Sequence, residues 1–188
     1  SLTSLLQPVI QSGIAHGIQP TKSLAAYGVA WSIVALLSGS LRRLHQLTIV
    51  FIEEKDDDNE PRVKLFCLSI GLSITILIII TALTPLGNIV FQNIIGVSKE
   101  LTAIARKVTL AFCLFPLIRS FRESYWGILM KQRTTSVIGI AKASNLITVF
   151  IVLITGITYL KIQAAIMGGI AFTAGELIES FIVWGFVR

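Results

Sequence analysis

The sequence predicts an all-α, polytopic membrane protein in which about six transmembrane helices form one bundle over residues 1–188. Hydrophobic residues make up 54% of the 188 positions and charged residues only 14%, against roughly 25% charged in soluble domains. The mean hydropathy is +0.80. Because a helix needs about 20 mostly apolar residues to cross a bilayer, a chain of this length holds about six spans with short connections. The composition therefore makes the lipid bilayer the first expected partner.

The charge balance and the motifs argue against several other classes of protein. The net charge is +6, but the basic residues are scattered between apolar segments, so we expect no nucleic-acid partner. The sequence contains no glycine-rich phosphate loop, nucleophile elbow or zinc-binding HExxH pattern. We therefore expect no enzymatic activity, no catalytic or metal-binding residue and no cofactor. The lack of an N-terminal Met and of a cleavage signature predicts a trimmed chain without a signal peptide.

The first two predicted spans are irregular. Residues 1–18 carry Pro8 and several polar side chains, which predicts a weak or truncated first helix. A second helix is expected over residues 24–52, with an interruption at 38–40, where small residues permit a kink or close packing. Residues 53–62 follow as the most strongly charged stretch of the chain, and a lipid-exposed segment cannot carry such charge. They predict a solvated loop on the cytoplasmic side.

The remaining predicted spans are more regular. Residues 63–83 form the most uniformly apolar run and are closed by Pro85. Residues 88–97 are expected to form a short connection, after which Ser98 is expected to cap the next helix. The small residues at 164–169 suit tight helix contacts. We expect the fourth, fifth and sixth helices at about residues 98–133, 134–160 and 163–187.

The distribution of Lys and Arg in the short loops gives the orientation. One side holds the loops after the second and fourth helices together with Arg188, and it carries six basic residues against five on the other side. Arg42 and Arg43, near the inner half of the second helix, add to the first side. We therefore expect both termini in the cytoplasm, in a plasma membrane or a bacterial inner membrane.

Ionisable side chains inside the predicted spans are the candidate functional residues, because each costs about 2.5 to 3.5 kcal/mol at a helix centre. Arg119 lies three residues before Arg122 and four before Glu123, which places these side chains on one helix face. Glu176 and Glu179 share a face in the same way. The candidate anion contacts are Arg42, Arg119, Arg122, Lys142 and Asn145, and the candidate coupling or ion-pairing groups are Glu123, Glu176 and Glu179.

Two interpretations of these charges stay open. In the structural one, Arg119 pairs with Glu123. The two acids of the sixth helix then pair with Lys142 or Arg42, and the ion pairs fix the helix register. In the functional one, the cations line a water-filled cavity that attracts an anion, while the acids bind coupling cations or protons. Five cations against three acids in the helices leave a positive surplus, which favours an anionic ligand.

Several segments, spread over nearly the whole chain, carry a family resemblance. They are residues 24–32 (LAAYGVAWS), 38–39, 50–51, 93–97 (NIIGV), 115–116, 127–131 and 168–180. These segments resemble the progressive ankylosis protein family. That family is similar in architecture to the superfamily of multidrug and toxic compound extrusion transporters and lipid-linked oligosaccharide flippases, in which two six-helix bundles face each other. The resemblance implies that this chain is one half-bundle, completed by a second six-helix bundle in the same parent chain or in a homodimer.

The resemblance also implies a function. It indicates a secondary transporter that exports a small anion of the pyrophosphate, nucleotide or citrate type by alternating access. The positive surplus in the helices points to the same class of substrate. The alternatives within the superfamily are a lipid-linked oligosaccharide flippase and a multidrug exporter. The alternative from another class is a membrane scaffold without transport activity, whose buried charges only hold helices together.

Overall fold

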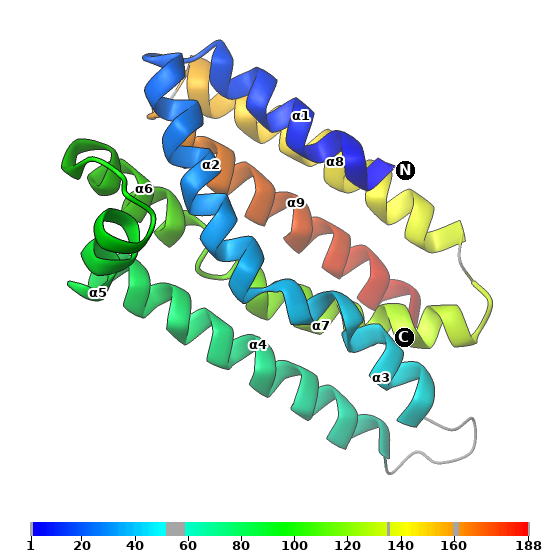
Figure 1. Cartoon of the computed structure of the whole chain (residues 1–188). Coiled ribbons are helices and arrows are strands. Elements are labelled where there is room, and N and C mark those ends of the chain that lie inside the picture. The colour runs from blue at the N-terminus through cyan, green and yellow to red at the C-terminus, as the bar shows by residue number, and fades with distance from the viewer. Residues whose placement is uncertain (1, 52–58, 135, 160–161, 188) are drawn as a thin grey trace.

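The chain folds into a bundle of helices that lie side by side, with successive segments running in alternating directions (Figure 1). Every regular element that the structure describes is helical, which confirms the predicted all-α class. The computed structural model describes residues 2–51, 59–134, 136–159 and 162–187. The elements are α1 (Leu2–Ala15), α2 (Pro20–Leu37), the 3-10 helix η1 (Gly39–Arg43), α3 (Leu44–Phe51), α4 (Asn59–Leu83), α5 (Leu86–Asn88), the π-helix η2 (Ile89–Ile94), α6 (Lys99–Ala111), α7 (Phe115–Lys131), α8 (Ser136–Thr158) and α9 (Ala164–Val187).

Four to five candidate membrane spans lie within the described residues. Helices α4, α8 and α9 are each long and apolar enough to cross a bilayer, as is the stretch Lys99–Lys131 that joins α6 and α7. The bent segment of α2, η1 and α3 makes a fifth span if it counts as one. Helix α1 has only 14 residues, about 21 Å at 1.5 Å per residue, which is short of the roughly 30 Å hydrocarbon core. The predicted count of six is therefore not confirmed, and the shortfall falls on the segment whose sequence is weakest.

A break divides the second predicted helix at the place that its small residues indicate. Helix α2 ends where the Ser38 amide donates to the Val34 carbonyl at 2.9 Å, and the following η1–α3 segment is bent from α2 by 54°. The interruption predicted at residues 38–40 is thus confirmed. Helix α2 packs against α6 and α9, whereas α3 packs against α7 and α4. The two halves of this segment therefore belong to different parts of the bundle.

Two predicted connections contain more helix than expected. Helix α4 begins at Asn59, so residues 59–62 of the predicted charged loop are helical, and residues 53–58 lie outside the described part of the chain. Pro61 is compatible with this start, because the first turn of a helix needs no amide donor. The predicted connection 88–97 is also wrong in part, since it contains the end of α5 and the π-helix η2.

The guanidinium of Arg106 holds the short helix α5 against the end of α4. Its Nε donates to the Ala82 carbonyl at 2.9 Å, and its Nη1 donates to Asn88 Oδ1 at 3.0 Å. The carbonyls at a helix end lack partners within the helix, and a basic side chain can supply one. Arg106 therefore ties α6 and α5 to the end of α4.

The fourth predicted helix consists of two helices. Ser98 caps α6 as predicted, since its Oγ accepts a hydrogen bond from the Leu101 amide at 3.4 Å. Helix α6 ends at Ala111, and α7 starts at Phe115 with Pro116 in its first turn. Proline lacks the amide donor and restricts the residue before it, so it favours a helix start at this position. The fifth and sixth predicted helices match α8 and α9 within a few residues.

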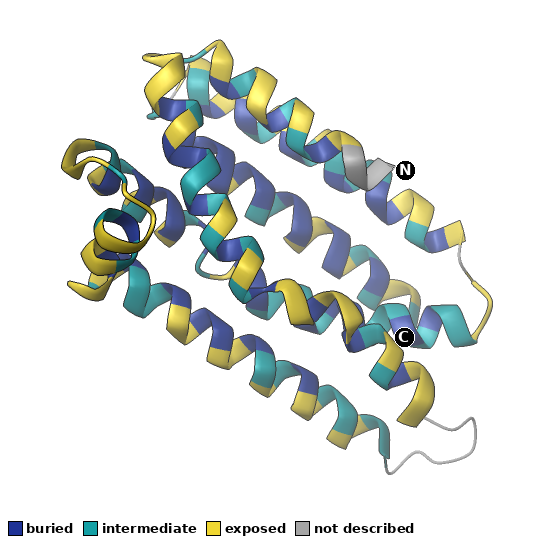
Figure 2. Ribbon diagram, in the orientation of Figure 1, coloured by how far each residue is buried: buried dark blue, intermediate teal, exposed yellow. Residues whose placement is uncertain are grey.

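Helix α9 lies at the centre of the bundle. It packs against α1, α2, α6, α7 and α8, and buried residues cover much of its length (Figure 2). Small residues allow the closest approach, because a Cβ added to Gly175 would lie 2.3 Å from Asn145 Oδ1 and one added to Gly156 would lie 2.2 Å from Met167 Sδ. The start of α1 and the end of α9 lie at the same end of the bundle (Figure 1). Their cytoplasmic placement stays a prediction.

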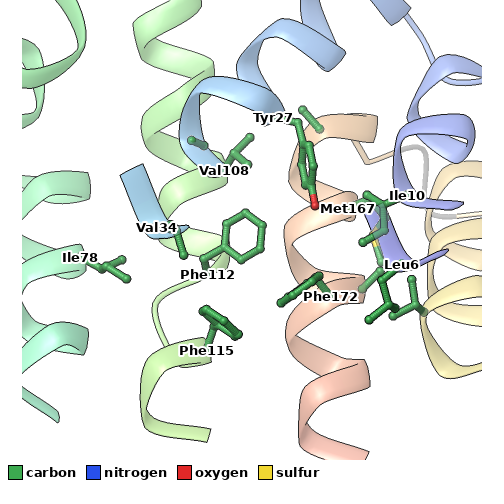
Figure 3. Packing of buried hydrophobic residues seen from close by; sticks show 14 of the residues in the cluster. Leu6, Ile10, Tyr27, Val34, Ile78, Val108, Phe112, Phe115, Met167 and Phe172 are labelled. Atoms are coloured by element: carbon green, nitrogen blue, oxygen red, sulfur yellow. The ribbon is translucent and has the colours of Figure 1, made fainter. Parts of the chain in front are cut away.

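An aromatic layer joins α2, α6, α7 and α9 in the core (Figure 3). The ring centroids of Trp31 and Phe172 are 4.8 Å apart, and those of Phe115 and Phe172 are 5.2 Å apart. Tilted and edge-on pairs at such distances are favourable beyond the apolar area that they bury. Phe115 also begins α7, so this layer fixes the end of the helix from which the charged residues project.

Candidate functional site

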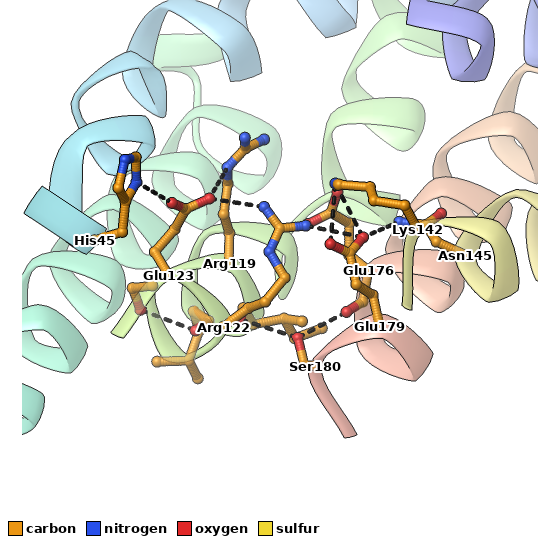
Figure 4. Close-up of polar contacts among 12 residues, drawn as sticks. His45, Arg119, Arg122, Glu123, Lys142, Asn145, Glu176, Glu179 and Ser180 are labelled. Atoms are coloured by element: carbon orange, nitrogen blue, oxygen red, sulfur yellow. Dashed lines mark hydrogen bonds and ion pairs between the residues drawn. The ribbon is translucent and has the colours of Figure 1, made fainter. Parts of the chain in front are cut away.

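A network of charged side chains is buried between α3, α7, α8 and α9 (Figure 4). Arg122 is its centre and has no exposed side-chain surface. Its Nη1 donates to Glu176 Oε2 at 2.6 Å and lies 3.1 Å from Glu179 Oε2, while its Nη2 donates to Glu123 Oε1 at 2.8 Å. A buried charge is tolerated only when it is paired and hydrogen-bonded. Three carboxylates meet that requirement for Arg122.

Two side chains of α8 complete the pairing of Glu179. Lys142 Nζ lies 3.0 Å from Glu179 Oε1 and donates to Oε2 at 3.1 Å, and Asn145 Nδ2 donates to Oε2 at 2.6 Å. Lys142 and Asn145 are three residues apart, so both point from one face of α8. We call Arg122, Lys142, Asn145, Glu176 and Glu179 the inner network, which links α7, α8 and α9.

The indole of Trp126 covers the inner network. The Arg122 guanidinium carbon lies 4.7 Å from its ring centroid and Lys142 Nζ lies 4.9 Å from it. Both distances are within the range of cation–π attraction. Trp126 was not a candidate from the sequence, although its place four residues after Arg122 puts the two side chains on one helix face. The ring therefore packs over two cations of the inner network.

His45 connects α3 to the network. Its Nδ1 lies 2.8 Å from Glu123 Oε2, and Glu123 is only 2% exposed. An ionised carboxylate only accepts hydrogen bonds, so Nδ1 is the donor. Gly127 on α7 permits this approach, because a Cβ there would lie 2.7 Å from the His45 carbonyl oxygen and 2.4 Å from Thr48 Cβ. Sequence reasoning missed His45 as a site residue, although it stands three residues after Arg42 in a predicted span.

Arg119 is the least satisfied cation of the site. Its Nε lies 3.6 Å from Glu123 Oε1 and is buried without a hydrogen-bond partner among the described residues. The side chain is 14% exposed, and its guanidinium carbon lies 5.5 Å from the Phe115 ring centroid. Figure 4 shows the terminal nitrogens pointing away from the inner network. The expected pairing of Arg119 with Glu123 is thus present only as a loose contact.

Arg42 and Arg43 do not join the network. Both are exposed in η1 and have no ion pair within the described part of the chain. The acids of α9 pair with Arg122 and Lys142 instead, which is one of the two pairings expected. The positive surplus in the sequence came from Arg42 and Arg43. Within the site, the buried cations Arg122 and Lys142 and the partly exposed Arg119 balance the acids Glu123, Glu176 and Glu179 in formal charge.

A comparison with known proteins gives the family. The family described as progressive ankylosis protein matches residues 7–184, a stretch that includes every residue of the buried network. No solved structure matches the chain. The family consists of membrane transport proteins and not of enzymes. With its candidate spans, the chain therefore belongs to the progressive ankylosis protein family and is an integral, multi-pass membrane protein.

Proposed function

We propose that the chain is a half-bundle of a secondary transporter that exports small anions of the pyrophosphate, nucleotide or citrate type. The observation that carries this proposal is the Arg119 guanidinium, which lies within a candidate span. Its Nε has only a loose contact with Glu123 and no hydrogen-bond partner among the described residues, and its terminal nitrogens point away from the inner network. A buried donor without an acceptor is unfavourable. An anion supplies acceptors and the opposite charge, and guanidinium pairs with such groups strongly. The family, which is linked to pyrophosphate transport, supports the same substrate class.

The proposal divides the sequence-derived candidates into two groups. Arg122, Lys142 and Asn145 already donate to Glu176 and Glu179, so their role is to hold α7, α8 and α9 together. Arg119 is the direct contact of the anion. Arg42 assists it by charge, because η1 is exposed and packs against α7.

Alternating access supplies the transport step in this proposal. In such transporters two repeats move against each other around a site near the membrane midplane. One bundle cannot do this alone. We therefore propose that a second six-helix bundle, in the same parent chain or in a second copy, faces the side of Arg119 and completes the anion pathway.

A lipid-linked oligosaccharide flippase is the second candidate, and one observation favours it. An apolar groove of about 570 Å³ runs between α4, α7 and α9 and is lined by Leu72, Phe121 and Phe181 among others. Ser180 also lines it and directly follows Glu179 of the inner network. A lipid-linked substrate carries an apolar chain beside an anionic group. The groove suits the apolar chain of such a substrate.

Efflux from liposomes tests the proposal, with the bundle present together with its proposed second bundle, in the full parent chain or as the two-copy assembly. Liposomes are loaded in turn with pyrophosphate, ATP and citrate, and efflux is compared for the unmodified protein, Arg119→Ala and Arg62→Ala. Arg62 is exposed at the start of α4 and serves as the matched control. We expect efflux to fall at least about tenfold in Arg119→Ala, since truncating one partner of a buried charged contact is costly, and to stay unchanged in Arg62→Ala.

Two outcomes contradict the proposal. Equal efflux in Arg119→Ala and the unmodified protein removes Arg119 from the anion pathway. No efflux of any of the three anions, with the protein folded and inserted, overturns anion export. In that case, movement of a fluorescent lipid-linked sugar between leaflets supports the flippase, and its absence supports a scaffold held by the inner network.

A further inference from the structure

We infer that His45 is a positioning residue for the anion site: its hydrogen bond holds the Glu123 carboxylate on Arg122 and so keeps Arg119 free for the substrate anion. This inference rests on the proposed function, because it assigns a role to a neighbour of the proposed anion contact. It goes beyond that function by naming Glu123 as an internal competitor of the substrate and His45 as the group that restrains it.

The geometry of Glu123 shows the restraint. Its Oε2 accepts from His45 Nδ1 at 2.8 Å, and its Oε1 accepts from Arg122 Nη2 at 2.8 Å. Both oxygens are thus held at full hydrogen-bond distance. Arg119 Nε lies 3.6 Å from Oε1 and makes no hydrogen bond to it. In Figure 4 the carboxylate lies between His45 and Arg122, with Arg119 beside it.

Release of the carboxylate would change the partner of Arg119. Glu123 follows Arg119 by four residues, a spacing at which an acid and a base pair readily on a helix. A carboxylate free to rotate can form two parallel hydrogen bonds with a guanidinium. Those bonds would use the donors that the anion needs. The affinity for the anion therefore depends on what holds Glu123 away.

His45 is suited to this role because its backbone is fixed. Helix α3 lies so close to α7 that a Cβ on Gly127 would be 2.7 Å from the His45 carbonyl oxygen. Among the described residues, His45 is also the only ion-pair or hydrogen-bond partner of the Glu123 side chain from outside α7, since Arg119 and Arg122 belong to the same helix as the acid. The segment of η1 and α3 is bent by 54° from α2, so α3 does not continue the direction of α2. Through its hydrogen bond, the imidazole therefore fixes the position of the Glu123 carboxylate relative to α3.

The first test is the KM for pyrophosphate efflux from liposomes that contain the protein. We expect His45→Leu to raise the KM about tenfold, since a hydrogen bond to a charged group is lost, while the maximal rate stays within about twofold. His45→Asn should restore the KM, because the asparagine amide nitrogen takes the place of Nδ1. Gln46→Leu is the matched control on the exposed side of α3. If the His45 changes impaired folding in general, the maximal rate would fall in both variants, and His45→Asn would not restore it.

The decisive test is the same His45→Leu change in a Glu123→Gln background. If His45 acts through the charge of Glu123, the second change leaves the KM of Glu123→Gln unaltered. An equal rise in KM in both backgrounds overturns the inference, as does an unchanged KM in His45→Leu alone.

Glu123→Gln by itself keeps the inference testable if His45→Leu fails to fold. Removing the competing charge should lower the KM, and an unchanged or higher KM contradicts the inference. Failure of the proposed function is distinct from all of these outcomes, because it shows as absent anion efflux in the unmodified protein or as no effect of Arg119→Ala.

Discussion

Arg119 and Arg122 lie three residues apart on α7 in opposite surroundings. Arg122 has no exposed side-chain surface, its Nη1 and Nη2 both contact carboxylates, and the Trp126 indole packs over its guanidinium, while its Nε has no hydrogen-bond partner among the described residues. Arg119 has one loose contact with Glu123 and a partly exposed side chain. The difference teaches that a cation inside a membrane helix is not by itself a binding site. What matters is whether the terminal nitrogens of the guanidinium already donate to carboxylates, as those of Arg122 do.

The elements that face the two arginines explain the difference. Arg122 points toward α9, which presents Glu176 and Glu179 from one face. Away from α9, helix α7 packs against α3, α4 and η1, and the sequence of η1, GSLRR, contains two exposed arginines and no acid. No carboxylate therefore comes from η1 to neutralise Arg119. The break in the second span leaves one arginine open while the continuous helix α9 closes the other.

The largest expected effect is the loss of stability in Arg122→Met. This change leaves the buried carboxylates of Glu123, Glu176 and Glu179 without their shared partner, and breaking a buried ion pair on one side is destabilising by about 3–5 kcal/mol. Denaturant unfolding in detergent micelles measures it, with Arg62→Met as the control. A loss as small as that of the control would show that the inner network does not hold the helices together.

A smaller loss of stability is expected for Lys142→Met. Glu179 keeps its contacts with Arg122 and Asn145 in this variant, so only part of its pairing is removed. We expect a loss of about 1–3 kcal/mol, the range for leaving a buried polar group partly unsatisfied. The same unfolding measurement applies, with Lys107→Met on the exposed side of α6 as the matched control. A loss equal to that of Arg122→Met would place Lys142 at the centre of the network instead.

Sequence reasoning identified the members of the site better than their roles. Spacing of three or four residues placed Arg119, Arg122 and Glu123 on one face, and the structure brings these side chains together. Spacing within a helix cannot tell which way that face turns, so Arg122 as the centre was not predictable. The contact of His45 depends on Gly127 and on the break before α3. The close approach at Gly127 and the angle of the break arise from packing between helices, and spacing within one helix does not predict them.

The charge surplus could not be assigned to the site for a similar reason. Counting cations along predicted spans includes Arg42 and Arg43, but both are exposed in η1 and make no ion pair with the network among the described residues. The predicted count of six spans is not confirmed, because the described part of α1 has 14 residues and is not among the candidate spans. The longest apolar runs, in α4, α8 and α9, were predictable from length and composition alone.

A third prediction separates stability from ligand binding at Arg119. We expect Arg119→Met to change the unfolding free energy by less than about 1 kcal/mol, because a loose ion pair contributes little. The unmodified protein should gain stability from pyrophosphate, by about 2.7 kcal/mol at 100 times the Kd, and Arg119→Met should gain none. Thermal unfolding with and without pyrophosphate checks both statements. A strong destabilisation without ligand would make Arg119 a member of the inner network.

The smallest effect is expected for Arg42→Gln. This side chain is exposed and has no ion pair among the described residues, so the change in stability should stay within about 0.5 kcal/mol. Its charge still attracts an anion toward Arg119, and salt screens such attraction over about 8–10 Å. The KM for pyrophosphate efflux should therefore rise slightly at low ionic strength, and the difference should vanish at high ionic strength. A rise that persists in high salt would mean that Arg42 binds the anion directly, because a desolvated contact is screened far less than a charge on the surface.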